Sequence, residues 1–164
     1  MSLGVLGSRG AITKQIMHDE ILIPIMDDLK TQGKNINRVI LPEEPLSSAF
    51  IDCWAKRQNI QVDLIKSDWA THGRRAGVFR DAMIEKSSTA LLVFEGPKSR
   101  YYLELAERIA KRRPECLVYL VEAKDISPIL LEVDNIARFK VTEKEEKEIL
   151  TIPKMFAKCL IKDD

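Results

Sequence analysis

Residues 67–100, SDWATHGRRAGVFRDAMIEKSSTALLVFEGPKSR, carry the pattern that decides the fold. A polar, glycine-containing loop comes first, and a segment with helical spacing of apolar residues follows it. Residues 89–94 (TALLVF) are continuously apolar, which predicts a strand buried on both faces. A basic turn, EGPKSR at 95–100, then leads into another helical segment. Loop, helix, buried strand and turn in this order are typical of α/β proteins that bind ligands at the carboxyl edge of a sheet.

The rest of the chain repeats this alternation of short apolar runs and amphipathic segments. Four further strands are predicted, at residues 3–7, 38–41, 61–65 and 116–121. Further helices are predicted over residues 13–32, from Ser47 or Ser48 onward, and after Arg100. Pro24 lies inside the first of these helices and is expected to kink or split it.

Strands separated by helices pair in parallel through right-handed crossovers, so the chain is predicted to form a doubly wound, Rossmann-like α/β sheet of about five strands. The simplest strand order is 3-2-1-4-5, in which the first and fourth strands are neighbours. We expect a single domain over residues 1–164, with a core at about 3–122 and a C-terminal helical extension at about 123–164. A short edge strand is predicted in that extension at 138–141, and helices at 143–148 and 155–161.

Composition and charge narrow the class of protein. The 164 residues are 45% hydrophobic and 31% charged, which is ordinary for one soluble domain. A formal net charge of +1 gives no general attraction to nucleic acid or to an anionic membrane, so neither partner is expected. Three cysteines without CxxC spacing, no signal-peptide pattern and no apolar run of membrane-spanning length predict a cytoplasmic protein. No paired metal ligands and no Ser/His/Asp arrangement can be traced, so neither a metal nor another cofactor is predicted.

Two short loops at the predicted junction of the first and fourth strands are the strongest functional signal. Both contain glycine, serine and arginine, and both precede helices, whose first amides and nearby guanidinium groups suit a phosphate or another anion. The first loop lacks both GxGxxG spacing and the Walker lysine pattern, so alone it is equally consistent with a tight turn. Together, the loops predict one shared crevice lined by Gly7, Ser8, Arg9, Gly96, Lys98, Ser99 and Arg100.

The role predicted for Arg80 depends on the orientation of its helix. Phe79 and Met83 are expected to face the core, which would place Arg80 at the edge of the crevice. There it would bind an anion and add little to stability, although single arginines such as Arg74 and Arg75 are more often solvated or structural. Three aromatic residues have a structural interpretation: Trp54 inside the core, Trp69 capping it, and His72 in a surface loop.

The sequences GSR after the first strand, DWATHGRRAGVFRDAM at 68–83 and EGPKSR at 95–100 resemble the SLOG superfamily, with its YspA-like branch as the nearest pattern. That branch has GSR, a glycine-rich GGARGAD element, DWxxxGxxAGxxRNxxM and GGxGT. The resemblance covers about residues 3–122, and the middle motif is its specific part. It implies a Rossmann-like fold, suggests a homodimer, and implies that the chain binds a nucleotide or nucleotide-derived small molecule. It assigns to the site Asp68, Trp69, Gly77 and Arg80, and Arg75 in the same stretch is a further ligand-binding candidate.

The departures from the pattern bear on catalysis. LPEEPLSS at 41–48 stands where the glycine-rich element is expected, and its prolines and carboxylates are poorly suited to phosphate. LOG-type relatives cleave the N-glycosidic bond of nucleoside monophosphates with a Glu at the place of Tyr102 and an arginine that matches Arg80. Binding or sensing is therefore expected rather than catalysis. The alternatives are a divergent phosphoribohydrolase using Arg80 and Glu95, or Glu104 in its place, and a degenerate domain acting as a protein-interaction scaffold.

Overall fold

The computed structural model describes residues 1–7, 13–43, 46–96, 98–123 and 127–132 of the chain. The strand and helices predicted at 138–161 lie outside these residues. Within the described part, no helix has the length and apolar character needed to cross a membrane.

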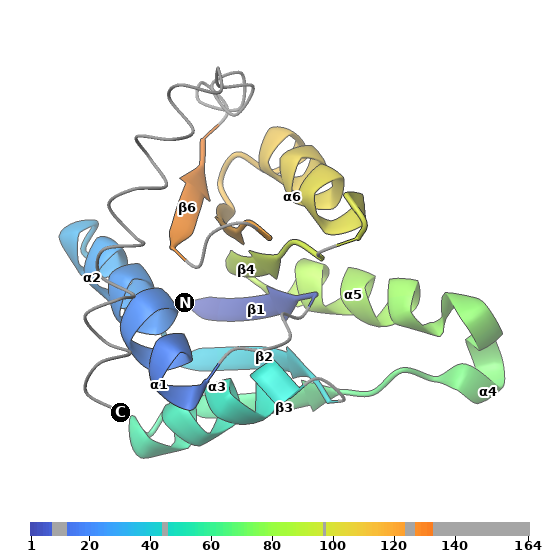
Figure 1. Ribbon diagram of the computed structural model, residues 1–164, viewed down its shortest axis with the longest axis horizontal. Coiled ribbons are helices and arrows are strands. Elements are labelled where there is room, and N and C mark those ends of the chain that lie inside the picture. Colours follow the sequence, from blue (N-terminus) through green and yellow to red (C-terminus); the bar gives the residue numbers. More distant parts are fainter. Residues whose placement is uncertain (8–12, 44–45, 97, 124–126, 133–164) are drawn as a thin grey trace.

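A six-stranded sheet with helices on both faces organises the described chain (Figure 1). Its spatial order is β3-β2-β1-β4-β5-β6, which confirms the predicted order of the first five strands. Those five strands pair in parallel, and β6 pairs with β5 in the antiparallel direction. The strands are β1 Ser2–Leu6, β2 Arg38–Pro42, β3 Gln61–Ile65, β4 Ala90–Phe94, β5 Leu117–Val121 and β6 Pro128–Leu131. Strand β6 lies in the predicted C-terminal extension, ahead of the edge strand predicted at 138–141, and was not itself predicted.

Alternating side chains of the central strands enter two separate core clusters, one on each face of the sheet. In β4, Leu92 and Phe94 enter the first cluster, whereas Leu91 and Val93 enter the second. The first cluster is covered by the N-terminal helical segment, residues 14–31, and by α3 (Leu46–Arg57). The second is covered by α5 (Ala76–Ser87) and α6 (Tyr101–Arg112). Burial on both faces explains why these strands are continuously apolar in sequence.

The N-terminal helical segment changes its winding around Pro24. It consists of α1 (Lys14–Ile16), a π-helical stretch η1 (Met17–Leu22) and α2 (Ile23–Thr31), with Pro24 in the first turn of α2. Proline lacks the N–H for an α-helical bond and its ring crowds the preceding turn, so a wider turn ahead of it accommodates the ring. The expected split is therefore present as a change of helix type.

The buried face of helix α5 is not the one that the spacing of its apolar residues predicts. Val78, Phe79 and Met83 are 51%, 42% and 57% exposed, so the expectation that Phe79 and Met83 face the core is wrong. The buried residues are Ala76, Asp81 and Ile84. A Cβ added at Gly4 of β1 would lie only 2.1 Å from Ser88 Oγ and 2.8 Å from Ile84, so α5 packs closely against β1. Such close packing leaves room for a narrow buried face on which Ile84 is the large apolar residue, rather than for the broad apolar stripe of Val78, Phe79 and Met83.

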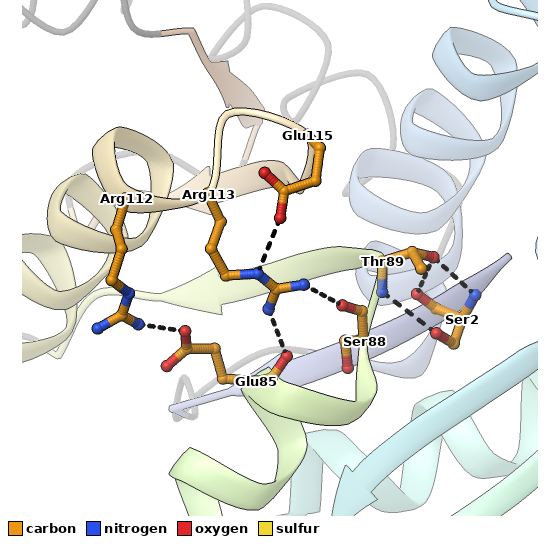
Figure 2. Close-up of polar contacts among 7 residues, drawn as sticks. All are labelled: Ser2, Glu85, Ser88, Thr89, Arg112, Arg113 and Glu115. Atoms are coloured by element: carbon orange, nitrogen blue, oxygen red, sulfur yellow. Dashed lines mark hydrogen bonds and ion pairs between the residues drawn. The ribbon is translucent and has the colours of Figure 1, made fainter.

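Polar contacts join strand and helix ends at the amino edge of the sheet (Figure 2). Arg113, just after α6, donates to the carbonyl oxygens of Glu85 at 2.7 Å and Ser88 at 3.0 Å, and so caps the C-terminal end of α5. Ser2 and Thr89 exchange hydrogen bonds between β1 and β4, with Ser2 N donating to Thr89 Oγ1 at 3.0 Å. The partners at this edge are largely backbone groups of helix and strand ends, which indicates a structural role.

Candidate functional site

The carboxyl ends of β1 and β4 lie side by side, with Leu6 paired to Val93. Gly7 follows β1 with a φ of 70°, and a Cβ at this position would lie 2.5 Å from the carbonyl oxygen of Phe94 and 3.2 Å from the ring of Tyr102. Only glycine fits there without displacing the end of β4. The two predicted loops therefore begin next to each other, at the point where the winding of the chain reverses.

The predicted loop residues are placed only in part. Ser8 and Arg9 lie outside the described residues, and so does Pro97. Lys98, Ser99 and Arg100 are exposed ahead of α6, where Ser99 Oγ accepts a hydrogen bond from the Tyr101 amide at 3.2 Å. Gly7 and Gly96 thus follow neighbouring strands, as predicted, whereas the crevice between the two loops and the reach of Arg9 into it stay predictions.

Arg80 belongs to a buried polar network between α5 and α6. Its Nε and Nη2 donate to Asp81 Oδ1 at 3.0 and 2.9 Å, and its Nη1 donates to Ser67 Oγ at 3.1 Å. The Tyr102 hydroxyl donates to the other carboxylate oxygen of Asp81 at 2.8 Å. The side chains of Arg80 and Asp81 are only 11% and 5% exposed. Whether Arg80 reaches the crevice stays a prediction, but it is not a solvated side chain: it is paired with Asp81, one of the buried residues of α5.

Tyr102 connects this network to the first loop. Its ring lies against Gly7, while its hydroxyl is bound to Asp81. Burial, and then the negative charge of Asp81, raise the pKa of the Tyr102 phenol well above its ordinary value. Tyr102 consequently stays protonated near neutral pH and does not supply the negative charge of a carboxylate at this place.

Glu95, the other candidate catalytic residue, stabilises the turn after β4. Its Oε2 accepts a hydrogen bond from the Ala123 amide at 2.9 Å, and its own amide donates to the Val121 carbonyl at 2.9 Å. Both bonds join the ends of β4 and β5. Glu104, the suggested substitute, is exposed on α6.

The remaining predicted residues lie on a projection beyond the carboxyl edge (Figure 1). Asp68 caps the short helix α4 (Trp69–His72) by accepting a bond from the Thr71 amide at 3.0 Å. The Thr71 side chain, and then its amide, lower the pKa of the Asp68 carboxyl by hydrogen bonding. Trp69 is 55% exposed, so the expectation that it caps the core is wrong, whereas Trp54 is buried at 7% as expected.

An aromatic and cationic stack joins this projection to α5, across the short helix η2 (Gly73–Arg75). The Arg75 guanidinium lies 5.6 Å from the centre of the Phe79 ring, and the His72 ring stacks on Phe79 at 4.1 Å. Gly77 lies in the first turn of α5, close to Arg80. Asp68, Trp69 and Arg75 thus form an exposed group apart from the buried Arg80 network.

Two serines at the start of α3 are further candidate site residues, which the sequence did not suggest as ligand-binding residues. Ser47 and Ser48 are each 2% exposed, and neither hydroxyl has a hydrogen-bond partner among the described residues. They follow β2, which pairs with β1, so they belong to the same edge of the sheet as Gly7. A buried hydroxyl without a partner costs about 1–3 kcal/mol. The sequence signal for these serines was only their suitability to begin a helix, which gives no indication of unpaired hydroxyls.

Comparisons with known proteins identify no relative from which a function for these residues could be taken. No protein-family model, no curated protein and no solved structure matches the chain. The fold and the polar groups at the carboxyl edge are therefore the basis on which a function is proposed.

Proposed function

We propose that the protein binds a nucleotide-derived small molecule at the carboxyl edge of β1, β2 and β4, as a sensor or binding module. The observation that carries the proposal is the pair of buried hydroxyls of Ser47 and Ser48, which lack partners in the described chain. Groups of this kind are normally paired, and an oxygen-rich ligand would supply the missing partners. Open α/β sheets bind their ligands where the strand order reverses, which here is the junction of β1 and β4.

Charge at this edge is compatible with an anionic part of the ligand. Lys98 and Arg100 are exposed after β4. Glu43, one of the carboxylates that made the 41–48 stretch unfavourable for phosphate, lies 3.6 Å from the ammonium group of Lys66, which offsets part of its charge. The objection drawn from the sequence is therefore weaker in the folded protein, where α3 also directs its first amides to this edge.

The same geometry favours binding over hydrolysis. Cleavage of an N-glycosidic bond would need a carboxylate free to stabilise the developing positive charge on the ribose. Glu95 uses one oxygen to hold the Ala123 amide, and Arg80 is engaged with Asp81 and Ser67. Losing general acid–base help costs roughly 10²–10⁴-fold in rate. We therefore expect no efficient release of free base from nucleoside monophosphates.

Retention of metabolites tests the proposal. The purified protein would be incubated with a small-molecule cell extract, washed, and denatured, and the released compounds identified by mass spectrometry. We expect the wild type to retain a nucleotide-derived compound, and the Ser47→Ala/Ser48→Ala variant to retain at least about tenfold less. Ser87→Ala, at an exposed position at the end of α5, serves as the control. Equal retention by the double variant, or no retained compound in the wild type, would refute the proposal.

A further inference from the structure

A groove of about 620 Å³ lies between the start of the N-terminal helical segment and the C-terminal half of α3. Its volume is in the range of small-molecule sites in proteins. Met17, Leu22 and Trp54 contribute buried apolar walls, and the half-buried Phe50 adds an aromatic surface. None of the described residues that line it belongs to the proposed carboxyl-edge site.

The rim of the groove carries positive charge from two different helices. Lys14 of α1 and Arg57 of α3 are both exposed and both line the groove. Neither forms an ion pair with another described residue, and the described lining includes no carboxylate. Two cations beside an apolar wall, with no acidic group in the described lining, match an anion that carries a flat apolar part.

His18 adds a polar group that is held in a defined orientation. Its Nδ1 lies 2.6 Å from Asp19 Oδ1, and Gln15 Nε2 donates to the other oxygen of the same carboxylate. These hydrogen bonds, that of His18 first, lower the pKa of Asp19, so the carboxylate is ionised near neutral pH. An ionised acceptor places a proton on Nδ1, so in the neutral ring Nε2 is a hydrogen-bond acceptor, and the contacts to an anion come from Lys14 and Arg57 rather than from His18. Asp19 itself does not line the groove.

We propose that this groove is a second binding site, for a small aromatic anion such as an aryl carboxylate or an aryl phosphate. The ring lies against Phe50 and Trp54, and Lys14 and Arg57 hold the anionic group. Aromatic contacts supply the apolar part of the affinity, and charge-assisted hydrogen bonds supply the selectivity for an anion.

The two tryptophans of the chain, Trp54 and Trp69, make the test specific. Their indole N–H signals would be followed by NMR in ¹⁵N-labelled protein and assigned with a Trp69→Phe variant. The probes are 1-naphthoate and phenyl phosphate, compared with neutral 1-naphthalenemethanol and with inorganic phosphate. We expect both aryl anions to shift the Trp54 signal with a Kd of about 1 mM or below, and the other two to bind at least about tenfold more weakly.

Matched variants separate the groove from general charge effects. Lys14→Gln/Arg57→Gln should weaken binding of the aryl anions by at least about tenfold, because both charge-assisted contacts are lost. Lys30→Gln/Lys111→Gln, at exposed positions of α2 and α6, removes the same charge and should leave the Kd unchanged. Equal affinity for the neutral aromatic, an unaltered Kd in the groove variant, or no Trp54 shift up to about 10 mM would overturn the proposal.

Discussion

The structure predicts a large loss of stability when the carboxylate of Asp81 is removed. Asp81 accepts three hydrogen bonds, two from Arg80 at 3.0 and 2.9 Å and one from Tyr102 at 2.8 Å, and its side chain is 5% exposed. The alanine variant leaves the Arg80 guanidinium buried without this carboxylate. Breaking a buried ion pair from one side costs about 3–5 kcal/mol. We expect the free energy of unfolding of Asp81→Ala to fall by about this amount.

Arg80→Ala should be similarly costly, because it leaves the Asp81 carboxylate buried with only Tyr102 as a described partner. Had Arg80 been at an open crevice edge, the cost would be about 0.5 kcal/mol. The double variant Arg80→Ala/Asp81→Ala removes both charges, so its cost should be clearly less than the sum of the single costs. Tyr102→Phe removes one hydrogen bond to a charged acceptor and should cost about 1.5–3 kcal/mol.

Urea denaturation measures these free energies, provided that the m-value stays constant across the series. Arg74→Ala, an exposed arginine in η2, is the control and should change stability by less than about 0.5 kcal/mol. The reasoning would be refuted if Asp81→Ala were as stable as this control, or if the costs of Arg80→Ala and Asp81→Ala added fully.

Three further predictions concern other parts of the chain. Ser47→Ala/Ser48→Ala removes two buried hydroxyls that lack described partners, and should raise the melting temperature of the ligand-free protein. The expected rise is about 2–4 °C for each kcal/mol gained in the free energy of unfolding. A lowered melting temperature would mean that the hydroxyls are paired. Arg113→Ala should destabilise the protein by about 1.5–3 kcal/mol, because the Arg113 guanidinium caps α5. Arg112→Ala removes an exposed ion pair with Glu85 and should cost about 1 kcal/mol or less in the same urea assay. Equal costs of the two variants would contradict the capping role of Arg113. Burial, together with the carboxylates of Asp81 and Asp28, raises the pKa of Tyr102 and Tyr119 above the ordinary 10.0. The folded state therefore keeps protons that the unfolded state releases, and the free energy of unfolding should fall as pH rises past 10. Tyr102→Phe and Tyr119→Phe should each make this fall with pH less steep, and an unchanged pH dependence in both variants would contradict the prediction.

The sheet could be predicted from sequence because its signal is local and strong. Runs such as Leu91 to Phe94 are apolar without interruption, and the segments between them have helical spacing, so few topologies remain. Strand β6 was not predicted because it is a short antiparallel edge strand that begins at Pro128, only a few residues after β5 ends at Val121. Its four residues, Pro128–Leu131, are all apolar and too few to show a period-2 pattern.

The candidate site was harder to predict because it depends on contacts between residues far apart in the chain. Val78, Phe79 and Met83 have the spacing of a core-facing stripe, yet the opposite side of α5 is buried, by Gly4 of β1 and by the Asp81 network. No pattern within α5 reports this, because the pairing of Asp81 with Tyr102 spans 21 residues. The lack of hydrogen-bond partners for Ser47 and Ser48 likewise becomes visible only once the surrounding elements are placed.

The most direct test of the central claim is to map where the retained nucleotide-derived compound binds, by following backbone amide signals in a ¹H–¹⁵N NMR titration. We predict that the largest shifts fall on Gly7, Ser47, Ser48 and Gly96, at the carboxyl edge of the sheet. The amide signals of residues at the amino edge should not shift, namely those of Ser2, Ser88 and Thr89. Shifts that concentrate at the amino edge, or that leave Ser47 and Ser48 unperturbed while the compound saturates the protein, would contradict the proposed site.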